Sequence, residues 1–189
     1  RRVAAASVAA AGVLTRPLAP RAFTVTDPGA LATIQDAGRP GRLAEGIALS
    51  GAADRPAFAA ANRLVGNAPD AAAIEVTVGG FRATASGDLW IAVTGAWGPV
   101  RVAGREGDPY RPQRWPAGTE LEIGAFRAGV RALLAVRGGV AAHPVLGSAA
   151  TDTLAGIGPE SLRAGDEIAT SDAARHPVPA VDLWPWTPP

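Results

Sequence analysis

The stretch DRPAFAAANRLVGNAPDAAAIEVTVGG, residues 54–80, contains the chain's clearest change of secondary structure. Asp54 is suited to cap a helix, Pro56 is tolerated in a first helical turn, and apolar residues then recur at helical spacing. Gly66 fits the position just after a helix, where a left-handed backbone is common. The stretch therefore predicts one principal α-helix over about residues 54–66, followed by a β-strand.

On both sides of this helix the chain is typical of short β-strands separated by turns. Before it, FTVTD and ALATIQD are separated by the turn residues Asp27-Pro28-Gly29. After it, further runs predict strands over residues 74–78, 81–85, 88–93, 100–104, 120–124, 130–136 and 167–170. Many short strands with one helix indicate a mainly β fold that forms a closed or nearly closed barrel.

The composition indicates one globular unit without a strong electrostatic field. A chain of 189 residues that is 48% hydrophobic and 19% charged can bury one sizeable core. Its formal net charge is only +1, so charge offers no case for nucleic acid or an anionic membrane. We therefore expect a soluble, cytoplasmic protein with no nucleic-acid or membrane partner.

Two residue types are missing from the chain. It has no cysteine, which excludes disulfides, thiolate nucleophiles and cysteine metal ligands. All 18 basic residues other than the histidines are arginine, so a P-loop lysine, a Schiff-base lysine and a biotinyl-lysine are excluded as well. Neither His143 nor His176 occurs in a zinc-site or GxSxG pattern. We predict no metal site, and any biotin must be carried by another polypeptide.

Irregular segments flank the predicted strands. The alanine-rich opening, residues 1–14, is only weakly hydrophobic, and we interpret it as an extension or linker, with a secretory signal as the alternative. The last residues, 176–189, are proline-rich and lack periodicity. We therefore divide the chain into an irregular N-terminal extension over residues 1–22, a barrel over 23–170, and a Pro-rich tail or truncated linker over 171–189.

Polar residues gather in the glycine-rich loops that precede the helix. Gln35, Asp36 and Arg39 follow a predicted strand, and Asp36 and Arg39 could pair with each other or clamp a planar amide or carboxylate. Ser50 and Gly51 lie just before the helix N-terminus, where backbone N–H groups favour an anion. A loop-stabilising ion pair and ordinary turn residues are the structural alternatives.

Five more candidates have structural alternatives of similar weight. Asp54 could act only as the helix cap, and Asn62 could hold a loop backbone or direct its amide at a ligand. Glu75 faces opposite to its apolar neighbours, so it could line a cavity or meet solvent. Arg137 follows a very apolar strand and Ser148 belongs to a polar turn, and turn chemistry explains both.

Several motifs occur in the order found in a known family. They are QDAGRPG (35–41), SGAAD (50–54), ANRLVGN (61–67), IEVTVGG (74–80), VTGA (93–96), AVRGGV (135–140), VLGSAATD (145–152) and LRAGDEI (162–168). With them the chain resembles the allophanate hydrolase subunit 2 family, also called the biotin-dependent carboxyltransferase family, which includes the C-type subunit of 5-oxoprolinase. Several ordered motifs are more specific than any single short pattern.

The resemblance implies a cyclophilin-like barrel and a subunit of an ATP-dependent 5-oxoprolinase, which opens 5-oxoproline to glutamate together with partner subunits. It implies a paired allophanate hydrolase subunit 1-like protein, namely the B-type subunit of 5-oxoprolinase, as the partner. ATP is expected for the assembled complex, with no cofactor on this chain. Family members continue into a second barrel-like half, so we expect the chain to be a partial member.

The implied task is to orient a small amide or ureido substrate and to stabilise charge on its oxygen with fixed donors. We predict catalytic roles for Asp36, Arg39 and Glu75, and substrate-binding roles for Gln35, Ser50, Gly51, Asp54, Asn62, Arg137 and Ser148. One alternative is the carboxyltransferase part of a urea carboxylase or allophanate-pathway enzyme. Others are a non-catalytic regulatory module that binds the paired subunit and a degraded family member without activity.

Overall fold

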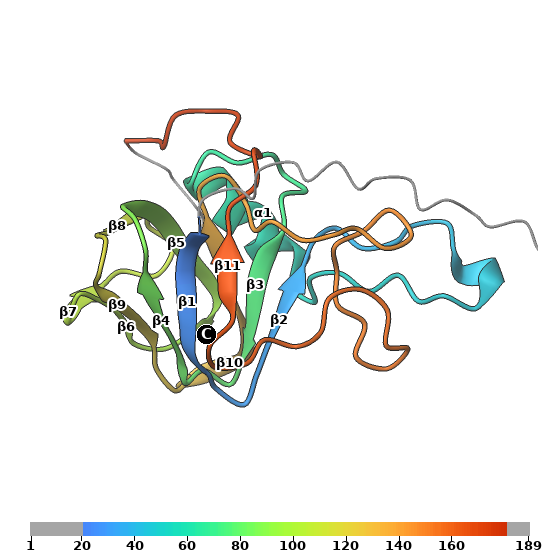
Figure 1. The fold of residues 1–189 in the computed structure, drawn as a ribbon, viewed down its shortest axis with the longest axis horizontal. Helices are drawn as coiled ribbons and strands as arrows, with labels where there is room; N and C mark the ends of the chain where they lie inside the picture. Colours follow the sequence, from blue (N-terminus) through green and yellow to red (C-terminus); the bar gives the residue numbers. More distant parts are fainter. Residues whose placement is uncertain (1–20, 181–189) are drawn as a thin grey trace, which may run out of the picture.

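The computed structural model describes residues 21–180, which fold mainly into β-strands (Figure 1). The strands are β1 (Arg21–Pro28), β2 (Leu31–Gln35), β3 (Ala73–Thr77), β4 (Phe81–Ala85), β5 (Leu89–Trp97), β6 (Val100–Val102), β7 (Arg105–Gly107), β8 (Gln113–Trp115), β9 (Glu120–Ile123), β10 (Ala128–Val136) and β11 (Glu167–Ala169). One α-helix, α1 (Arg55–Leu64), and a short 3-10 helix, η1 (Leu43–Glu45), complete the described elements. The predicted mainly β fold with one principal helix is confirmed.

The strands form two antiparallel sheets. The six-stranded sheet has the order β11-β1-β4-β9-β6-β7, and the five-stranded sheet has the order β2-β3-β10-β5-β8. The pairings among the described strands keep the sheets separate, so the expected barrel is built from two sheets and not from one continuous ladder. Strands β1 and β2 are joined by a tight turn, which carries the chain from one sheet to the other.

The main core lies between the two sheets. Phe23 and Leu121 enter it from the six-stranded sheet, and Ile74 and Leu134 enter it from the five-stranded sheet. The fully buried Trp115 lies against Phe23, with the two ring centroids 5.3 Å apart. Since each large apolar side chain contributes about 1.5–3 kcal/mol when it is fully buried, this layer stabilises the pairing of the sheets.

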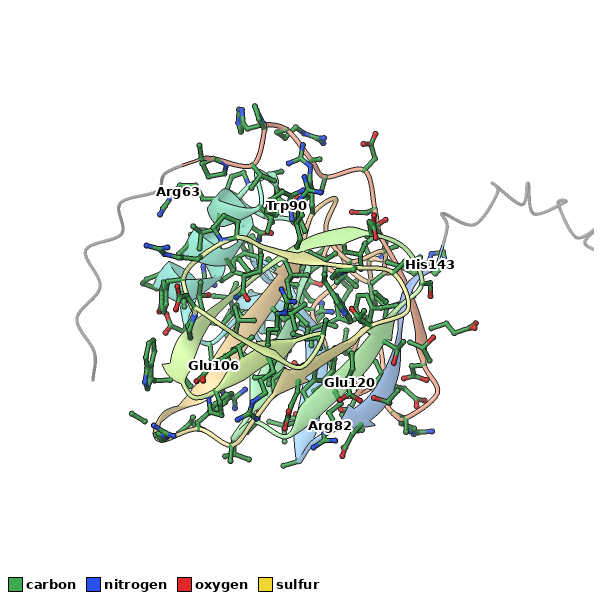
Figure 2. All side chains as sticks on the ribbon, turned by 90° about the vertical axis from the view of Figure 1, so that its left-hand side faces the viewer. Arg63, Arg82, Trp90, Glu106, Glu120 and His143 are labelled. Atoms are coloured by element: carbon green, nitrogen blue, oxygen red, sulfur yellow. The ribbon has the colours of Figure 1, made fainter. Side chains whose placement is uncertain are left out.

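The outer faces of the two sheets differ. Helix α1 covers the five-stranded sheet, where Phe58 and Leu64 pack with Leu133 of β10. The outer face of the six-stranded sheet carries charged side chains, and Figure 2 shows Arg82 and Glu120 there. The alternation of apolar and charged residues along β4 and β9 produces this arrangement, because neighbouring residues in a strand point to opposite faces.

The helix begins and ends as its sequence predicts. Asp54 accepts a hydrogen bond from the backbone N–H of Ala57 at 2.9 Å, which is the expected cap. Pro56 lies in the first turn, and Gly66 has a φ of +70° just after the C-cap Val65. None of the helices in residues 21–180 combines the length and apolarity needed to cross a bilayer.

Two long connections leave the sheets on the same side and lie next to each other, as Figure 1 shows beyond the end of β2. We name residues 36–52, which include η1, the first arm, and residues 141–162 the second arm. Five of the seven large hydrophobic side chains that are exposed in the described structure belong to these arms: Leu43, Leu49, Val145, Leu146 and Leu154. The arms also contain most of the candidate site residues.

The structure adds details that the sequence did not predict. Strands β7 and β8 have three residues each, which is too short for an alternating pattern to be visible. Strand β1 begins at Arg21, two residues earlier than expected. Beyond β11, the backbone N–H of His176 donates to the carbonyl of Gly66 at 3.0 Å, next to the end of α1. The remaining parts of the predicted extension and tail, residues 1–20 and 181–189, lie outside the described residues.

Candidate functional site

The first arm folds back so that its two ends contact each other. The backbone N–H of Arg39 donates to the carbonyl of Leu49 at 2.7 Å, and that of Ala52 donates to the carbonyl of Asp36 at 3.0 Å. Gly38 and Gly51 lie at this crossing with left-handed backbones, at φ values of +86° and +83°. The glycine-rich motifs QDAGRPG and SGAAD therefore build one backbone junction at the end of β2.

Two serine–aspartate hydrogen bonds of opposite direction join the arms. The hydroxyl of Ser148, in the second arm, donates to Asp36 Oδ1 at 2.6 Å, and the hydroxyl of Ser50, in the first arm, donates to Asp152 Oδ2 at 2.9 Å. Asp36 Oδ2 also accepts the backbone N–H of Ala149 at 2.6 Å. Each arm therefore supplies one carboxylate and one hydroxyl, which fixes the arms relative to each other.

The carboxylate of Asp152 is stabilised by its surroundings. It accepts hydrogen bonds from the backbone N–H of Ala155, the hydroxyl of Ser50 and the backbone N–H of Leu154. These bonds and the nearby charge of Arg39 lower the pKa of Asp152 below its ordinary value, against the opposing effect of burial. Asp152 is therefore the negatively charged neighbour of Arg39 at this junction.

Arg39 is almost completely buried, with 1% of its surface exposed. Its Nε donates to the carbonyl of Val145 at 3.0 Å and its Nη2 donates to the carbonyl of Ala150 at 2.5 Å, both in the second arm. Its Nη1 is fully buried and has no hydrogen-bond partner. Asp36 bonds to other groups, so the predicted Asp36–Arg39 pair is not formed. The guanidinium keeps one free donor in the protein interior.

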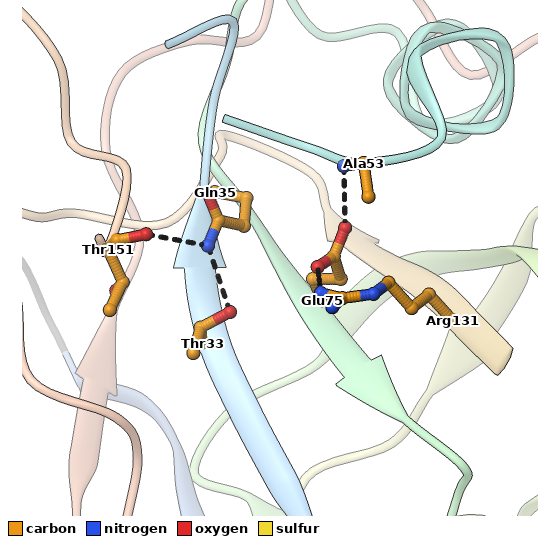
Figure 3. A network of polar contacts seen from close by, with 6 residues as sticks. All are labelled: Thr33, Gln35, Ala53, Glu75, Arg131 and Thr151. Atoms are coloured by element: carbon orange, nitrogen blue, oxygen red, sulfur yellow. Dashed lines mark hydrogen bonds and ion pairs between the residues drawn. The ribbon is translucent and has the colours of Figure 1, made fainter. Parts of the chain in front are cut away.

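Gln35, at the end of β2, has a free acceptor in the same region. Its amide nitrogen donates to Thr33 Oγ1 and to the carbonyl of Thr151, each at 3.0 Å (Figure 3). A carbonyl can only accept, so the amide nitrogen must face Thr151 and the amide oxygen must point elsewhere. That oxygen, Oε1, is buried without a partner.

Three buried side-chain atoms lack a partner in the described structure, and all three lie around one peptide of the second arm. They are Gln35 Oε1, Arg39 Nη1 and Thr151 Oγ1. Arg39 bonds to the carbonyl of Ala150 and Gln35 bonds to the carbonyl of Thr151, the next residue. A buried polar group without a partner costs about 1–3 kcal/mol, so three at one place indicate a position where another molecule supplies the missing partners.

A polar hollow of about 340 Å³ opens beside this peptide in the second arm. Thr151, Asp152, Gly158 and Ser161 are among the residues that line it. The hollow is the space through which a small molecule could approach the three atoms. Within residues 21–180, no group of three or more His, Asp and Glu side chains is placed to hold a metal ion.

Glu75 and Asp54 support the helix start. Glu75 is 1% exposed, accepts the backbone N–H of Ala53 at 2.8 Å, and pairs with Arg131 (Figure 3). It thereby ties the segment before α1 to strand β3, while Asp54 caps the helix. Both bond to neighbours within the fold, so roles in catalysis or binding stay predictions for these two residues.

Asn62 and Arg137 lie at the other end of α1. The Asn62 amide donates to the carbonyl of Ala71 at 2.8 Å and accepts from Asn67 at 3.0 Å. Arg137 donates to the carbonyls of Val65 and His176, each at 2.7 Å. These bonds hold the segments around the helix end, and they involve none of the residues at the junction of the arms.

Six of the ten predicted site residues therefore meet where the arms join: Gln35, Asp36, Arg39, Ser50, Gly51 and Ser148. Thr151 and Asp152 belong to the same junction but were not among the predicted site residues. Both occur in the motif VLGSAATD, which turn chemistry explained adequately on sequence alone. A buried threonine hydroxyl without a partner is visible only after the chain has folded.

Comparison with known proteins identifies the family. A family profile described as "Carboxyltransferase domain, subdomain A and B" matches residues 45–189. This chain belongs to the carboxyltransferase domain family. The carboxyltransferase-domain chain is 37% identical over 157 residues to the C-type subunit of 5-oxoprolinase from Escherichia coli, which covers 80% of the chain and 50% of that protein.

Two further relatives agree with this assignment. The urea amidolyase of Saccharomyces cerevisiae is 39% identical over 140 residues, covering 74% of the chain and 8% of that protein. The crystal structure of TTHA0988 superimposes with a TM-score of 0.79 at 36% sequence identity, covering 88% of the chain and 62% of that structure. The carboxyltransferase-domain chain thus spans about half the length of the E. coli protein.

Proposed function

We propose that this carboxyltransferase-domain chain is part of a subunit of an ATP-dependent 5-oxoprolinase, in which it binds and orients the substrate amide. The single observation that carries the proposal is the group of three unpartnered buried atoms around Ala150 and Thr151. The similarity to the C-type subunit of a 5-oxoprolinase supports the choice of substrate.

The free atoms suit an amide. An amide has a carbonyl oxygen that accepts hydrogen bonds and an N–H that donates one. Arg39 Nη1 is a free donor, Gln35 Oε1 is a free acceptor, and the Thr151 hydroxyl can act in either way. 5-Oxoproline is a cyclic amide, so its ring carbonyl would bond to Arg39 and its ring N–H would bond to Gln35.

The charge of Arg39 gives this arrangement a chemical use. When a nucleophile attacks an amide, negative charge develops on the carbonyl oxygen, and a fixed donor in a buried site stabilises that charge. Arg39 is held by the carbonyls of Val145 and Ala150, so its free Nη1 needs no reorganisation during the reaction. Asp36 and Ser148 then act as positioning residues, because they hold the second arm against the first.

The remaining components are assigned to other polypeptides. We propose a paired subunit like the B-type subunit of 5-oxoprolinase as the partner and the cytoplasm as the location. The exposed leucines and valines on the arms suit a surface that another subunit covers. ATP would be used by the assembled complex, and biotin, where needed, would be carried elsewhere, since these 189 residues contain no lysine.

A second candidate is favoured by the similarity to urea amidolyase and by the name of the family. In that case the chain would serve as part of a carboxyltransferase acting on urea. Urea also presents one carbonyl oxygen and N–H groups, so the same three atoms would bind it. The two candidates differ in the co-substrate, which is ATP in the first and a carboxylated biotin in the second.

The test is to purify the protein with its paired subunits and to measure glutamate formation from 5-oxoproline and ATP. We expect activity in the wild type and a loss of at least tenfold in kcat/KM for Arg39→Lys, which keeps the charge but lacks the planar fork of donors. Arg42→Lys is the matched control, because Arg42 lies on the surface of the same arm and pairs with Glu45.

Circular dichroism of both variants checks that they fold. Biotin-dependent carboxylation of urea without glutamate formation would favour the second candidate. Tight binding of the paired subunit without either activity would instead make the chain a non-catalytic module. Full activity of the folded Arg39→Lys variant would contradict the proposed role of the guanidinium.

A further inference from the structure

Thr151 has a position that no other residue of the junction shares. It lines the hollow in the second arm, and its hydroxyl is also one of the three buried atoms without a partner. Gln35 and Arg39 do not line this hollow. Thr151 therefore connects the space that a small molecule can reach with the two free groups behind it.

The fold does not need the hydroxyl of Thr151. The backbone N–H of Thr151 donates to the carbonyl of Ile34 at 2.8 Å, and its carbonyl accepts the amide of Gln35 at 3.0 Å. These two bonds fix the residue between the second arm and strand β2. The side chain is 6% exposed, so its hydroxyl loses water on folding and gains no bond in return.

Only a thin wall separates the hollow from Arg39. Gly158 lines the hollow, and a Cβ atom built on it would lie 2.8 Å from Arg39 Nη2 and still nearer to the carbonyl of Ala150. The backbone of Gly158, at a φ of +89°, is therefore packed directly on the guanidinium. A molecule in the hollow lies next to Thr151 and within one peptide of the free donor of Arg39.

We infer that Thr151 is a substrate-contacting residue and that the hollow lined by Thr151, Asp152 and Gly158 is the route by which a small amide reaches Arg39 and Gln35. This inference rests on the proposed function and adds a residue and an approach path to it. The Thr151 hydroxyl donates to the carbonyl oxygen of the amide or accepts its N–H.

The experiment compares Thr151→Val with Thr151→Ser in the protein assembled with its paired subunits. Valine has nearly the same shape as threonine but lacks the hydroxyl, whereas serine keeps it. We expect Thr151→Val to raise KM for 5-oxoproline about tenfold with little change in kcat, as loss of a ground-state contact does, and Thr151→Ser to stay within about threefold of the wild type.

Thermal unfolding separates this role from a structural one. Because the free hydroxyl has no partner to lose, the midpoint of Thr151→Val should equal or exceed that of the wild type. A variant that lost stability together with activity would show a structural role and overturn the inference. An unchanged KM in Thr151→Val, with an active wild type, would also overturn it and leave the proposed function intact.

An inactive wild type would refute the proposed function, and direct binding then tests the inference on its own. The chain would be heated with 5-oxoproline or with urea as the probe. A rise in the unfolding midpoint that is present in the wild type and in Thr151→Ser but absent in Thr151→Val would uphold the contact. No rise with either probe in the wild type would overturn it.

Discussion

Replacing Gly38 by alanine is expected to destabilise the fold much more than the same replacement at Gly41, although both glycines lie in the first arm and have similar backbones. Their φ values are +86° and +80°, so each alanine has a left-handed conformation that costs about 1–2 kcal/mol. The backbone term is therefore nearly equal in the two variants.

The surroundings of the two positions differ. A Cβ at Gly38 would lie 2.7 Å from the carbonyl oxygen of Ser50 and still nearer to that of Leu49, whereas a Cβ at Gly41 meets nothing within 4 Å. Forcing atoms into such a contact typically costs about 1–3 kcal/mol. Relief by separating the two segments would stretch the bond from the Arg39 N–H to the Leu49 carbonyl, which contributes about 1 kcal/mol.

We therefore expect Gly38→Ala to be about 2–3 kcal/mol less stable than Gly41→Ala. The measurement is urea unfolding followed by tryptophan fluorescence, which reports on the buried Trp115. For a chain of this size a difference of about 2 kcal/mol also corresponds to roughly 4–8 °C in the unfolding midpoint. Equal destabilisation of the two variants would refute the close backbone crossing, and with it the geometry of the first arm.

Two other predictions concern the second arm. Asp152 has a lowered pKa, so its contribution to stability is present above its ordinary value of about 3.8 and is lost as the pH falls through the lower folded value. Asp152→Asn should therefore be about 1 kcal/mol less stable than the wild type at pH 7, and the difference in unfolding free energy should vanish in strong acid; a constant difference at all pH values would argue against it. Leu154 is 96% exposed, and we expect Leu154→Ser to unfold as the wild type does but to bind the paired subunit at least tenfold more weakly by calorimetry. Val130→Ser, at an exposed position outside the arms, is the control, and equal binding by both variants would place the subunit interface elsewhere.

Part of the fold could be predicted because its causes are local. The cap at Asp54, the proline in the first turn and the glycine after the C-cap fix the ends of α1 within a few residues of one another. The alternation along β4 and β9 likewise specifies strands with one buried face. Strands β7 and β8 escaped prediction because each is stabilised by pairing with a distant or already formed neighbour and not by its own pattern.

The site could be predicted only in its general position. The motifs QDAGRPG and SGAAD contain residues that do meet, and their glycines correctly indicate close approach of the backbone. Their side-chain partners lie far along the chain: Ser148 is 112 residues from Asp36, and Asp152 is 102 residues from Ser50. No local pattern encodes such pairs, which is also why Asp36 and Arg39 were considered as partners for each other.

The sequence by itself determined the β-rich class, the single helix, the absence of thiol and lysine chemistry, and the motifs that mark the family. Each of these depends on residue type or on contacts within a few positions of the chain. Only the tertiary structure decided that the two arms bond to each other through Asp36 and Asp152, and that Gln35, Arg39 and Thr151 keep free polar atoms at their junction. The physical reason is that hydrogen-bond satisfaction in the interior depends on every segment that packs there, so it exists only in the complete fold.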